Sequence, residues 1–496
     1  MTETPTAAPI ELVGGKRPWP ALYALCLGFF MILVDMTIVS VATPAIITDL
    51  GADVNSVLWV TSAYLLAYAV PVLITGRLGD RFGPRRIYLI GLAVFTAASL
   101  ACGLTSTVES LVVARVVQGL GAAMMTPQTM AVITRIFPAA QRGKAMALWG
   151  ATSGVSMVVG PLLGGVLVDG LGWEWIFFIN VPVGIVGFVL ALRLVPVLET
   201  HQHSFDWLGV ALSGVGMFLL VFGIQEGHQH AWSGWIIAMI VGGLVVLAAF
   251  VLWQRRNTRE PLVPLGLFGD RNFSLSNVAI SVMGFSITSI GFPFMIYAQA
   301  VRGYSPTEAA SLLVPMAIMV IVLARPVGRL TDAVHPRVIA GFGFTMIATS
   351  FFWLSTQMTP DAHLWQLVLP MILMGVGNAT IWSPVSATAM RNLPIQQAGA
   401  GAGVFNATRQ VGGVLGAAAI AVLMDSRLAH FGLSGAGSPE AAGSGAMPAQ
   451  VMDDFASAMA QSMLLPAAVL LVGLVAVLCY ERPRHTGFPA AAASPE

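Results

Sequence analysis

The chain has 496 residues, of which 56% are hydrophobic and only 9% are charged. Soluble globular domains carry about 25% charged residues, so this composition excludes an ordinary water-soluble protein. The formal net charge of +1 gives no reason to expect a nucleic-acid partner, and the three cysteines, Cys26, Cys102 and Cys479, lie in apolar runs without disulfide or metal-ligand spacing.

Apolar runs of about 20 residues, the length that crosses a bilayer, recur along the chain. The first is longer than the core of a signal peptide and lacks a cleavage site, so we expect it to remain as a span. Fourteen spans are predicted, near residues 21–45, 56–76, 87–105, 110–134, 145–168, 175–196, 206–224, 235–253, 273–297, 307–327, 337–356, 365–389, 400–424 and 457–480.

Basic residues indicate the orientation of these spans. Lys and Arg gather in alternate connections, whereas the opposite connections carry only Arg302 and Arg427. Because Lys and Arg are retained on the cytoplasmic side, we predict a multi-pass protein of the plasma or inner membrane with both termini in the cytoplasm. Residues 425–456, rich in Gly, Ala and Ser, are predicted to form an external loop.

The first span contains Asp35, the only acidic residue that we place deep in any span. A charge at the bilayer centre costs roughly 2.5–3.5 kcal/mol, so such a residue is retained mainly where it has a function. One interpretation is a structural partner for an arginine. The other is a proton carrier, because the approach or withdrawal of a cation changes the proton affinity of a carboxylate.

A short basic connection, Gly-Arg-Leu-Gly-Asp-Arg-Phe-Gly-Pro-Arg-Arg at residues 76–86, follows the second span. Six of its positions recur at the same offsets in residues 328–337, which predicts two related halves, as in many secondary transporters. We predict that the connection is a conformational latch on the cytoplasmic side. The residues assigned to it are Gly76, Asp80, Arg81, Gly83, Arg85, Arg86 and, from the second copy, Asp332.

Two arginines are predicted to lie well inside spans. Arg115 lies about one and a half turns into the fourth span, at a depth compatible with Asp35, so we predict that the two residues pair for proton coupling. Arg409 lies in the thirteenth span. We expect it either to contact a substrate or to brace a central cavity, and the sequence does not separate these roles.

The fifth span has glycines four residues apart, at Gly150 and Gly154 and again at Gly160 and Gly164, so each pair shares a helix face. Pro161 is expected to bend this helix. The pattern suits ordinary helix packing as well as a surface that repacks between two halves. The residues assigned to this helix motif are Gly154, Gly160, Pro161, Gly164 and Gly165.

Polar and aromatic side chains inside spans are candidates for an amphipathic substrate cavity, although an interhelical hydrogen bond is an equally good interpretation of each. They are Gln128, Trp149, Asn378, Trp382, Asn406, Arg409 and Gln410. His228 and His230 beside Glu226 form an isolated external group, and no metal site is predicted.

Together these features resemble the fourteen-span drug:proton antiporters of the major facilitator superfamily, the EmrB/QacA-like branch, over nearly the whole chain. The similar segments are residues 33–44, 76–86, 111–121, 156–165, 175–182 and 303–306. The sequence departs from the pattern at Ser40, Thr43 and Glu174. It also lacks a deep acidic residue in the tenth span, which argues against divalent substrates.

The resemblance implies an all-α polytopic membrane protein with a major facilitator fold of 14 transmembrane helices. We expect a six-helix bundle in residues 1–199, two inserted helices in residues 200–260, a second six-helix bundle in residues 261–480 and a cytoplasmic tail in residues 481–496. One bundle would rock against the other to give alternating access.

The implied activity is export of lipophilic, monocationic or neutral small molecules or drugs in exchange for protons. It requires no enzyme chemistry and no cofactor, since a proton gradient drives it, and we expect a monomer in the lipid bilayer. One alternative is a lipid or glycolipid exporter or flippase on the same scaffold. Another is a membrane sensor that transports nothing.

Overall fold

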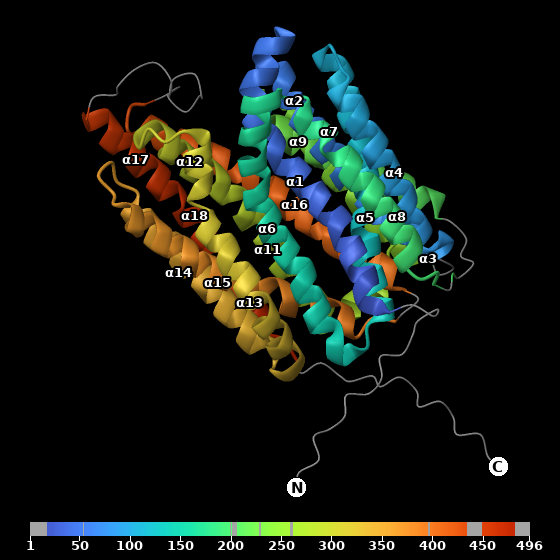
Figure 1. The fold of residues 1–496 in the computed structure, drawn as a ribbon. Helices are drawn as coiled ribbons and strands as arrows, with labels where there is room; N and C mark the ends of the chain where they lie inside the picture. The colour runs from blue at the N-terminus through green and yellow to red at the C-terminus, as the bar shows by residue number, and fades with distance from the viewer. Residues whose placement is uncertain are drawn as a thin grey trace, which may run out of the picture.

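The computed structural model describes residues 17–52, 54–198, 200, 206–227, 230–257, 261–394, 397–433 and 449–481. These residues form helices and contain no strand, as expected for an all-α membrane protein (Figure 1). In chain order the helices are α1 (Pro18–Leu50), α2 (Val54–Ala69), α3 (Val72–Phe82), α4 (Pro84–Gly103), α5 (Val108–Ile136), α6 (Ala139–Leu171), α7 (Trp175–Phe178), α8 (Asn180–Leu194), α9 (Trp207–Gly227), α10 (Gly234–Arg256), η1 (Leu265–Gly269), α11 (Arg271–Ile296), η2 (Tyr297–Val301), α12 (Pro306–Ser311), α13 (Val314–Ala333), α14 (Pro336–Gln357), α15 (Leu364–Arg391), α16 (Ala398–His430), α17 (Ala449–Ser462) and α18 (Leu464–Leu478).

Among the described residues, 13 helical segments are long and apolar enough to cross a membrane, and the bent pair α2–α3 makes a fourteenth. The second predicted span is therefore not one straight helix: α2 and α3 meet at 44°. Pro71 explains the break, because proline has no backbone N–H to donate and disfavours a helical residue before it.

The basic connection at residues 76–86 is also shorter than predicted. Residues 76–82 belong to α3, and only Gly83 separates α3 from α4. Gly83 has φ +90°, a left-handed conformation that favours glycine, and Pro84 then starts α4. The external loop predicted at residues 425–456 is likewise too long, because α16 continues to His430 and α17 begins at Ala449.

The helices pack as two groups, α1 to α8 and α11 to α18, that meet along a few helices (Figure 1). Between the groups, α6 packs against α13 and α15, and α16 packs against α3 and α5. The predicted domain boundaries fall beside residues outside the described part and stay predictions.

The remaining helices, α9 and α10, pack on each other, and α9 also contacts α2 and α16. Asp206, directly before α9, connects the start of α9 to the end of α10 and to Leu262 beyond it. Its carboxylate accepts hydrogen bonds from Trp253 Nε1 (2.8 Å) and Gln254 Nε2 (2.8 Å), and from the backbone N–H groups of Gly209 (2.9 Å) and Leu262 (3.3 Å). Burial raises the pKa of Asp206, but these hydrogen bonds outweigh burial and bring the pKa below its ordinary value of 3.8.

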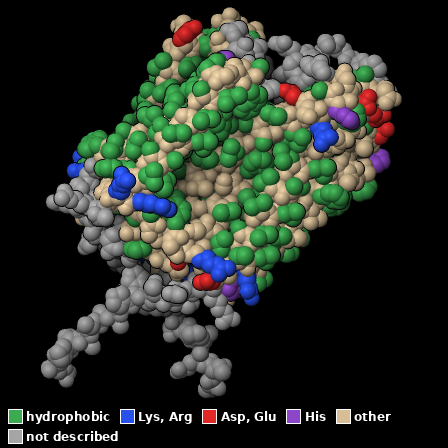
Figure 2. Space-filling model, turned by 180° about the vertical axis from the view of Figure 1, so that it is seen from behind, with side chains coloured by type: hydrophobic (Ala, Val, Ile, Leu, Met, Phe, Trp, Pro, Cys, Tyr) green, Lys and Arg blue, Asp and Glu red, His purple; other side chains and the backbone are tan. Residues whose placement is uncertain are grey.

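The outer surface is largely hydrophobic (Figure 2). Large apolar side chains such as Leu104, Val166 and Val475 are more than half exposed. Most of the Lys and Arg side chains visible in Figure 2 lie at its left and lower edges rather than over the hydrophobic area. A surface of this kind suits contact with lipid along the sides and with water at the ends.

Candidate functional site

A buried polar network joins α1, α5 and α8 around Asp35. Arg115 Nη1 lies 2.5 Å from Asp35 Oδ2, and both side chains are fully buried. Two amides complete the network: Gln118 Nε2 and Asn180 Nδ2 each donate to Asp35 Oδ1 over 2.9 Å. Asn180 Nδ2 also lies 3.0 Å from Ser99 Oγ. The carboxylate is thus held by one cation and two neutral donors.

Arg115 is itself held on several sides. Its Nε donates to the backbone carbonyl of Val60 (3.1 Å) and its Nη1 to Gln118 Oε1 (2.7 Å). The guanidinium lies 4.0 Å from the ring centroid of Tyr64 and 5.6 Å from that of Phe177, both within cation–π range. The predicted pairing of Asp35 with Arg115 is therefore present in the geometry.

Sequence analysis did not identify Gln118 and Asn180 as site residues. Gln118 was detectable in principle, because it lies three residues after Arg115 and so on the same helix face. Asn180 comes from α8, far along the chain. Its one local signal is an amide in an otherwise apolar run.

The predicted latch places Asp80 against the start of α16. Its carboxylate accepts hydrogen bonds from the backbone N–H groups of Gly399 (3.0 Å) and Ala400 (2.9 Å). Arg135 Nη2 lies 2.5 Å away, and Arg77 approaches to 3.9 Å. A helix N-terminus has unpaired N–H groups and a partial positive charge, so it is a favourable place for this buried carboxylate. Asp80 thus connects the two groups of helices.

Small residues let α3 and α16 approach at the latch. A Cβ added to Gly76 would come within 2.5 Å of the carbonyl oxygen of Gly399. Of the other predicted latch residues, Arg85 donates to the carbonyl of Leu192, Arg81 is partly buried and Arg86 is exposed. The side chain of Asp332 lies outside the described residues. Arg135, which the prediction omitted, joins the site from the far end of α5.

The glycines of α6 face two different neighbours. A Cβ on Gly160 would come within 1.9 Å of Thr37 Oγ1, and one on Gly164 within 2.9 Å of Ile38, both on α1. A Cβ on Gly154 would come within 2.9 Å of Val320 on α13, in the other group of helices. Gly165 faces Thr307 on α12, and Pro161 lies inside the helix. The glycine motif therefore serves packing within one group and across the interface.

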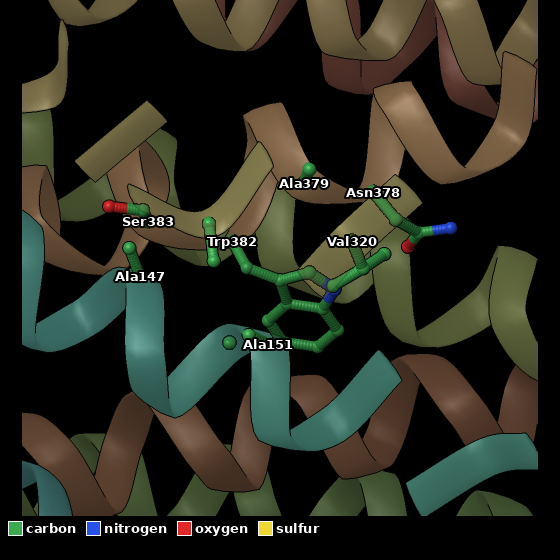
Figure 3. A pocket seen from close by; sticks show the side chains of 9 residues that line it. Ala147, Ala151, Val320, Asn378, Ala379, Trp382 and Ser383 are labelled. Atoms are coloured by element: carbon green, nitrogen blue, oxygen red, sulfur yellow. The ribbon is translucent and has the colours of Figure 1, made fainter. Parts of the chain in front are cut away.

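Two of the predicted cavity residues, Trp149 and Trp382, meet across the interface. Trp149 stacks on Phe29 at 4.9 Å and makes an edge contact with Trp382 at 6.1 Å. Trp149 is fully buried, and its Nε1 has no hydrogen-bond partner in the part of the chain that the structure describes. In Figure 3, Trp382 projects from α15 onto the turn of α6 that carries Ala151. The pocket drawn there is lined by Ala147, Gly150, Ala151, Val320, Ala324, Asn378, Ala379, Trp382 and Ser383.

The other predicted cavity residues do not form one cluster. Gln128 lies beside α3 and donates to the carbonyl of Thr75 over 2.6 Å, so it belongs to the surroundings of the latch. Asn406 is fully buried against α5, where its Nδ2 lies 3.9 Å from Met130 Sδ. Arg409 donates to Tyr68 Oη over 3.2 Å. Gln410 is partly buried.

Comparison with known families settles the class of protein. Residues 25–417 match the family model described as Major Facilitator Superfamily. The chain belongs to this superfamily. Members of the superfamily are transporters rather than enzymes. The matched residues 25–417 of this facilitator include Asp35, Asp80, Arg115 and Arg409.

Similarity to individual members of the superfamily shows to which branch of the facilitators the chain belongs. The chain is 54% identical to an uncharacterized MFS-type transporter of Mycobacterium tuberculosis, over 93% of this chain and 81% of that protein. It is 36% identical to the tetracenomycin C resistance and export protein of Streptomyces glaucescens, over 83% of this chain and 77% of that protein. It is 30% identical to the multidrug export protein EmrB of Haemophilus influenzae, over 79% of this chain and 78% of that protein. These relatives confirm the resemblance to the EmrB/QacA-like branch of facilitators.

Proposed function

We propose that the protein exports lipophilic small molecules, either monocationic or neutral, in exchange for protons. The observation that carries the proposal is the buried network of Asp35, Arg115, Gln118 and Asn180, which includes a carboxylate inside a membrane-spanning helix. A carboxylate held in this way can take up and release one proton if the surrounding helices move. The export activities named for two relatives support the direction of transport.

The proposed cycle uses alternating access between the two groups of helices. In the present conformation, Asp80 joins α3 to the start of α16 and Ser383 Oγ donates to the carbonyl of Gly143 on α6 over 2.7 Å. These contacts would keep the cytoplasmic side closed. Protonation of Asp35 would remove its attraction for Arg115 and so favour rearrangement of α1 against α5, after which the latch would open and admit substrate.

We further propose that the protein acts as a monomer and that both termini lie in the cytoplasm. The basic side chains around the latch support this orientation. Arg77, Arg81 and Arg85 gather where α3 ends and α4 begins, and Lys and Arg are enriched at the cytoplasmic ends of membrane spans.

The test is efflux in proteoliposomes with an imposed pH gradient. Ethidium as a monocation, Nile red as a neutral dye and a fluorescent phospholipid would be compared. Dye transport that follows the gradient in the wild type and is lost in Asp35→Asn supports the proposal. The matched control is Asp49→Asn, an exposed carboxylate on the same helix, which should transport normally.

Three results would overturn the proposal. Wild-type efflux by Asp35→Asn would remove the proton-carrier role. Movement of the phospholipid alone would favour the flippase alternative. Absence of any transport by folded wild-type protein would favour the sensor.

A further inference from the structure

Arg409 lies at the meeting point of three helices and has no counter-ion among the described residues. It lies about one third of the way along α16, and its backbone carbonyl faces Gly284 on α11, where an added Cβ would come within 2.2 Å of it. Its Nη2 reaches Tyr68 Oη on α2, 3.2 Å away. The side chain is only partly buried, so it extends from one helix group to the other while part of it stays accessible.

The donors of Arg409 are largely unused. A guanidinium has five N–H donors, and the one side-chain partner of Arg409 in the described part of the chain is Tyr68. Its Nε is buried and has no hydrogen-bond partner. No carboxylate lies within ion-pair distance of it among the described residues. Tyr68 Oη, which also lies 3.0 Å from Thr126 Oγ1, contacts Arg409 only through Nη2.

Charged side chains inside membrane proteins normally pair with one another or bind carbonyl groups. The N–H groups of Arg409 that make no hydrogen bond among the described residues can therefore bind an oxygen acceptor. A cationic ligand at the same place would add repulsion in a medium of low dielectric constant, where charges interact more strongly than in water.

We propose that Arg409 anchors an electronegative oxygen of the exported molecule, so that the site selects neutral or anionic lipophilic molecules with a carbonyl, phenol or carboxylate group over monocations. This inference rests on the proposed export function and revises its substrate class: monocations are disfavoured, neutral molecules are kept and anions are added. Tyr68 orients the guanidinium, and the remaining N–H groups of Arg409 bind the ligand oxygen.

The anchor is connected to the proton site through α2. Tyr68 lies one turn from Tyr64, with ring centroids 6.2 Å apart, and Tyr64 lies under the guanidinium of Arg115. Both tyrosines are fully buried. A ligand that shifts Arg409 and Tyr68 therefore has a continuous path of packed side chains to the Asp35–Arg115 pair.

The experiment compares two dyes that differ in one group, rhodamine B, which carries a carboxylate, and its ethyl ester, a cation. Binding to purified full-length protein in detergent is measured without a pH gradient. We expect the wild type to bind the acid about tenfold more tightly than the ester, as for one charge-assisted hydrogen bond. Arg409→Gln should remove this preference, and Arg409→Lys should keep part of it.

The matched control is Arg427→Gln, the same change at the outer end of the same helix, which should keep the full preference. Thermal unfolding of each variant shows that the protein is folded. Tighter binding of the ester by the wild type, or an unchanged preference in Arg409→Gln, would overturn the proposal. Binding is measured without a pH gradient, so the two proposals can fail separately. If the wild type prefers rhodamine B over its ester but shows no proton-driven efflux, the proposed function is contradicted and the role of Arg409 in ligand binding is still supported.

Discussion

Arg115 and Arg409, the two arginines that the sequence predicts to lie well inside spans, have opposite surroundings. Arg115 is fully buried and has a carboxylate, an amide, a backbone carbonyl and two aromatic rings as partners. Arg409 has one tyrosine hydroxyl and no carboxylate among the described residues. The charge of Arg115 is balanced by Asp35, whereas the charge of Arg409 has no counter-ion in the described part of the chain. Under the proposed function, this difference separates the proposed proton site at Asp35 from the proposed ligand site at Arg409.

Removing each charge should affect stability very differently, and this is the largest expected effect. Arg115→Gln leaves Asp35 as an unpaired buried carboxylate, so it should lower the free energy of unfolding by about 3–5 kcal/mol. Arg409→Gln leaves no carboxylate unpaired and loses one hydrogen bond, so its cost should stay below about 1.5 kcal/mol. Thermal unfolding in detergent measures both.

A double variant checks the reason for this difference. Asp35→Asn combined with Arg115→Gln removes both charges of the pair, and it should recover most of the stability lost in Arg115→Gln. Equal destabilisation by Arg115→Gln and Arg409→Gln would show that the two environments are not distinct.

Membrane voltage should distinguish the substrate classes. Exchange of a neutral molecule for one proton moves one positive charge inward, which an inside-negative potential favours by about 2.3 kcal/mol per 100 mV. Exchange of a monocation for one proton moves no net charge. Efflux of Nile red from liposomes, with the potential set by potassium and valinomycin, should accelerate at inside-negative voltage. A rate of Nile red efflux that ignores voltage would contradict one-for-one exchange of a neutral substrate.

The expected effect of removing the Asp80 charge lies between those of the other substitutions, because this carboxylate is shared between arginines and a helix N-terminus. Asp80→Asn should weaken the closed interface by about 0.5–2 kcal/mol, the usual cost of losing a helix cap. Reaction of Ala379→Cys, a buried position in the pocket between α6 and α15, with a maleimide measures how often the interface opens. The background is Cys479→Ser, because Cys479 is the exposed native thiol. The rate should rise several-fold in the Asp80 variant. An unchanged rate would show that the latch does not limit opening.

The smallest expected effect concerns Asp206, whose pKa is lowered in the folded protein. A group with a lowered pKa stabilises the fold above its unfolded pKa and loses that contribution as the pH falls through the folded value. Asp206→Asn should therefore cost less than about 1 kcal/mol at pH 7, and the difference from wild type should begin to shrink near about pH 4, the ordinary pKa of aspartate, and vanish only below the lowered pKa of the folded protein. A difference that is equally large in acid would exclude this origin.

Much of the fold was predictable because membrane spans depend on local composition. Runs of apolar residues gave the spans, and their order agrees with the helices of the structure. The break at Pro71 is also a local effect, although the span prediction did not use it. The extents of residues 76–86 and 425–456 were wrong, because helices that pack against neighbours continue past the apolar run.

The candidate site was predictable only in part. Asp35 and Arg115 stand out because charges in apolar helices are rare, and the structure brings them together. Asn180 and Arg135 reach their partners from distant helices, and nothing in their local sequence indicates the register of helix packing that places them there. Gln128 has the residue type expected for a cavity but lies beside the latch, since type alone does not give the direction of a side chain.

The edge contact between Trp149 and Trp382 has a spectroscopic consequence. The two indoles belong to opposite groups of helices, and each is almost completely shielded from solvent. Indole emission moves to longer wavelength when water reaches the ring, so separation of α6 from α15 would shift the fluorescence of this pair to the red. A chain that keeps only these two of its 12 tryptophans would report the separation of α6 from α15 without any attached label.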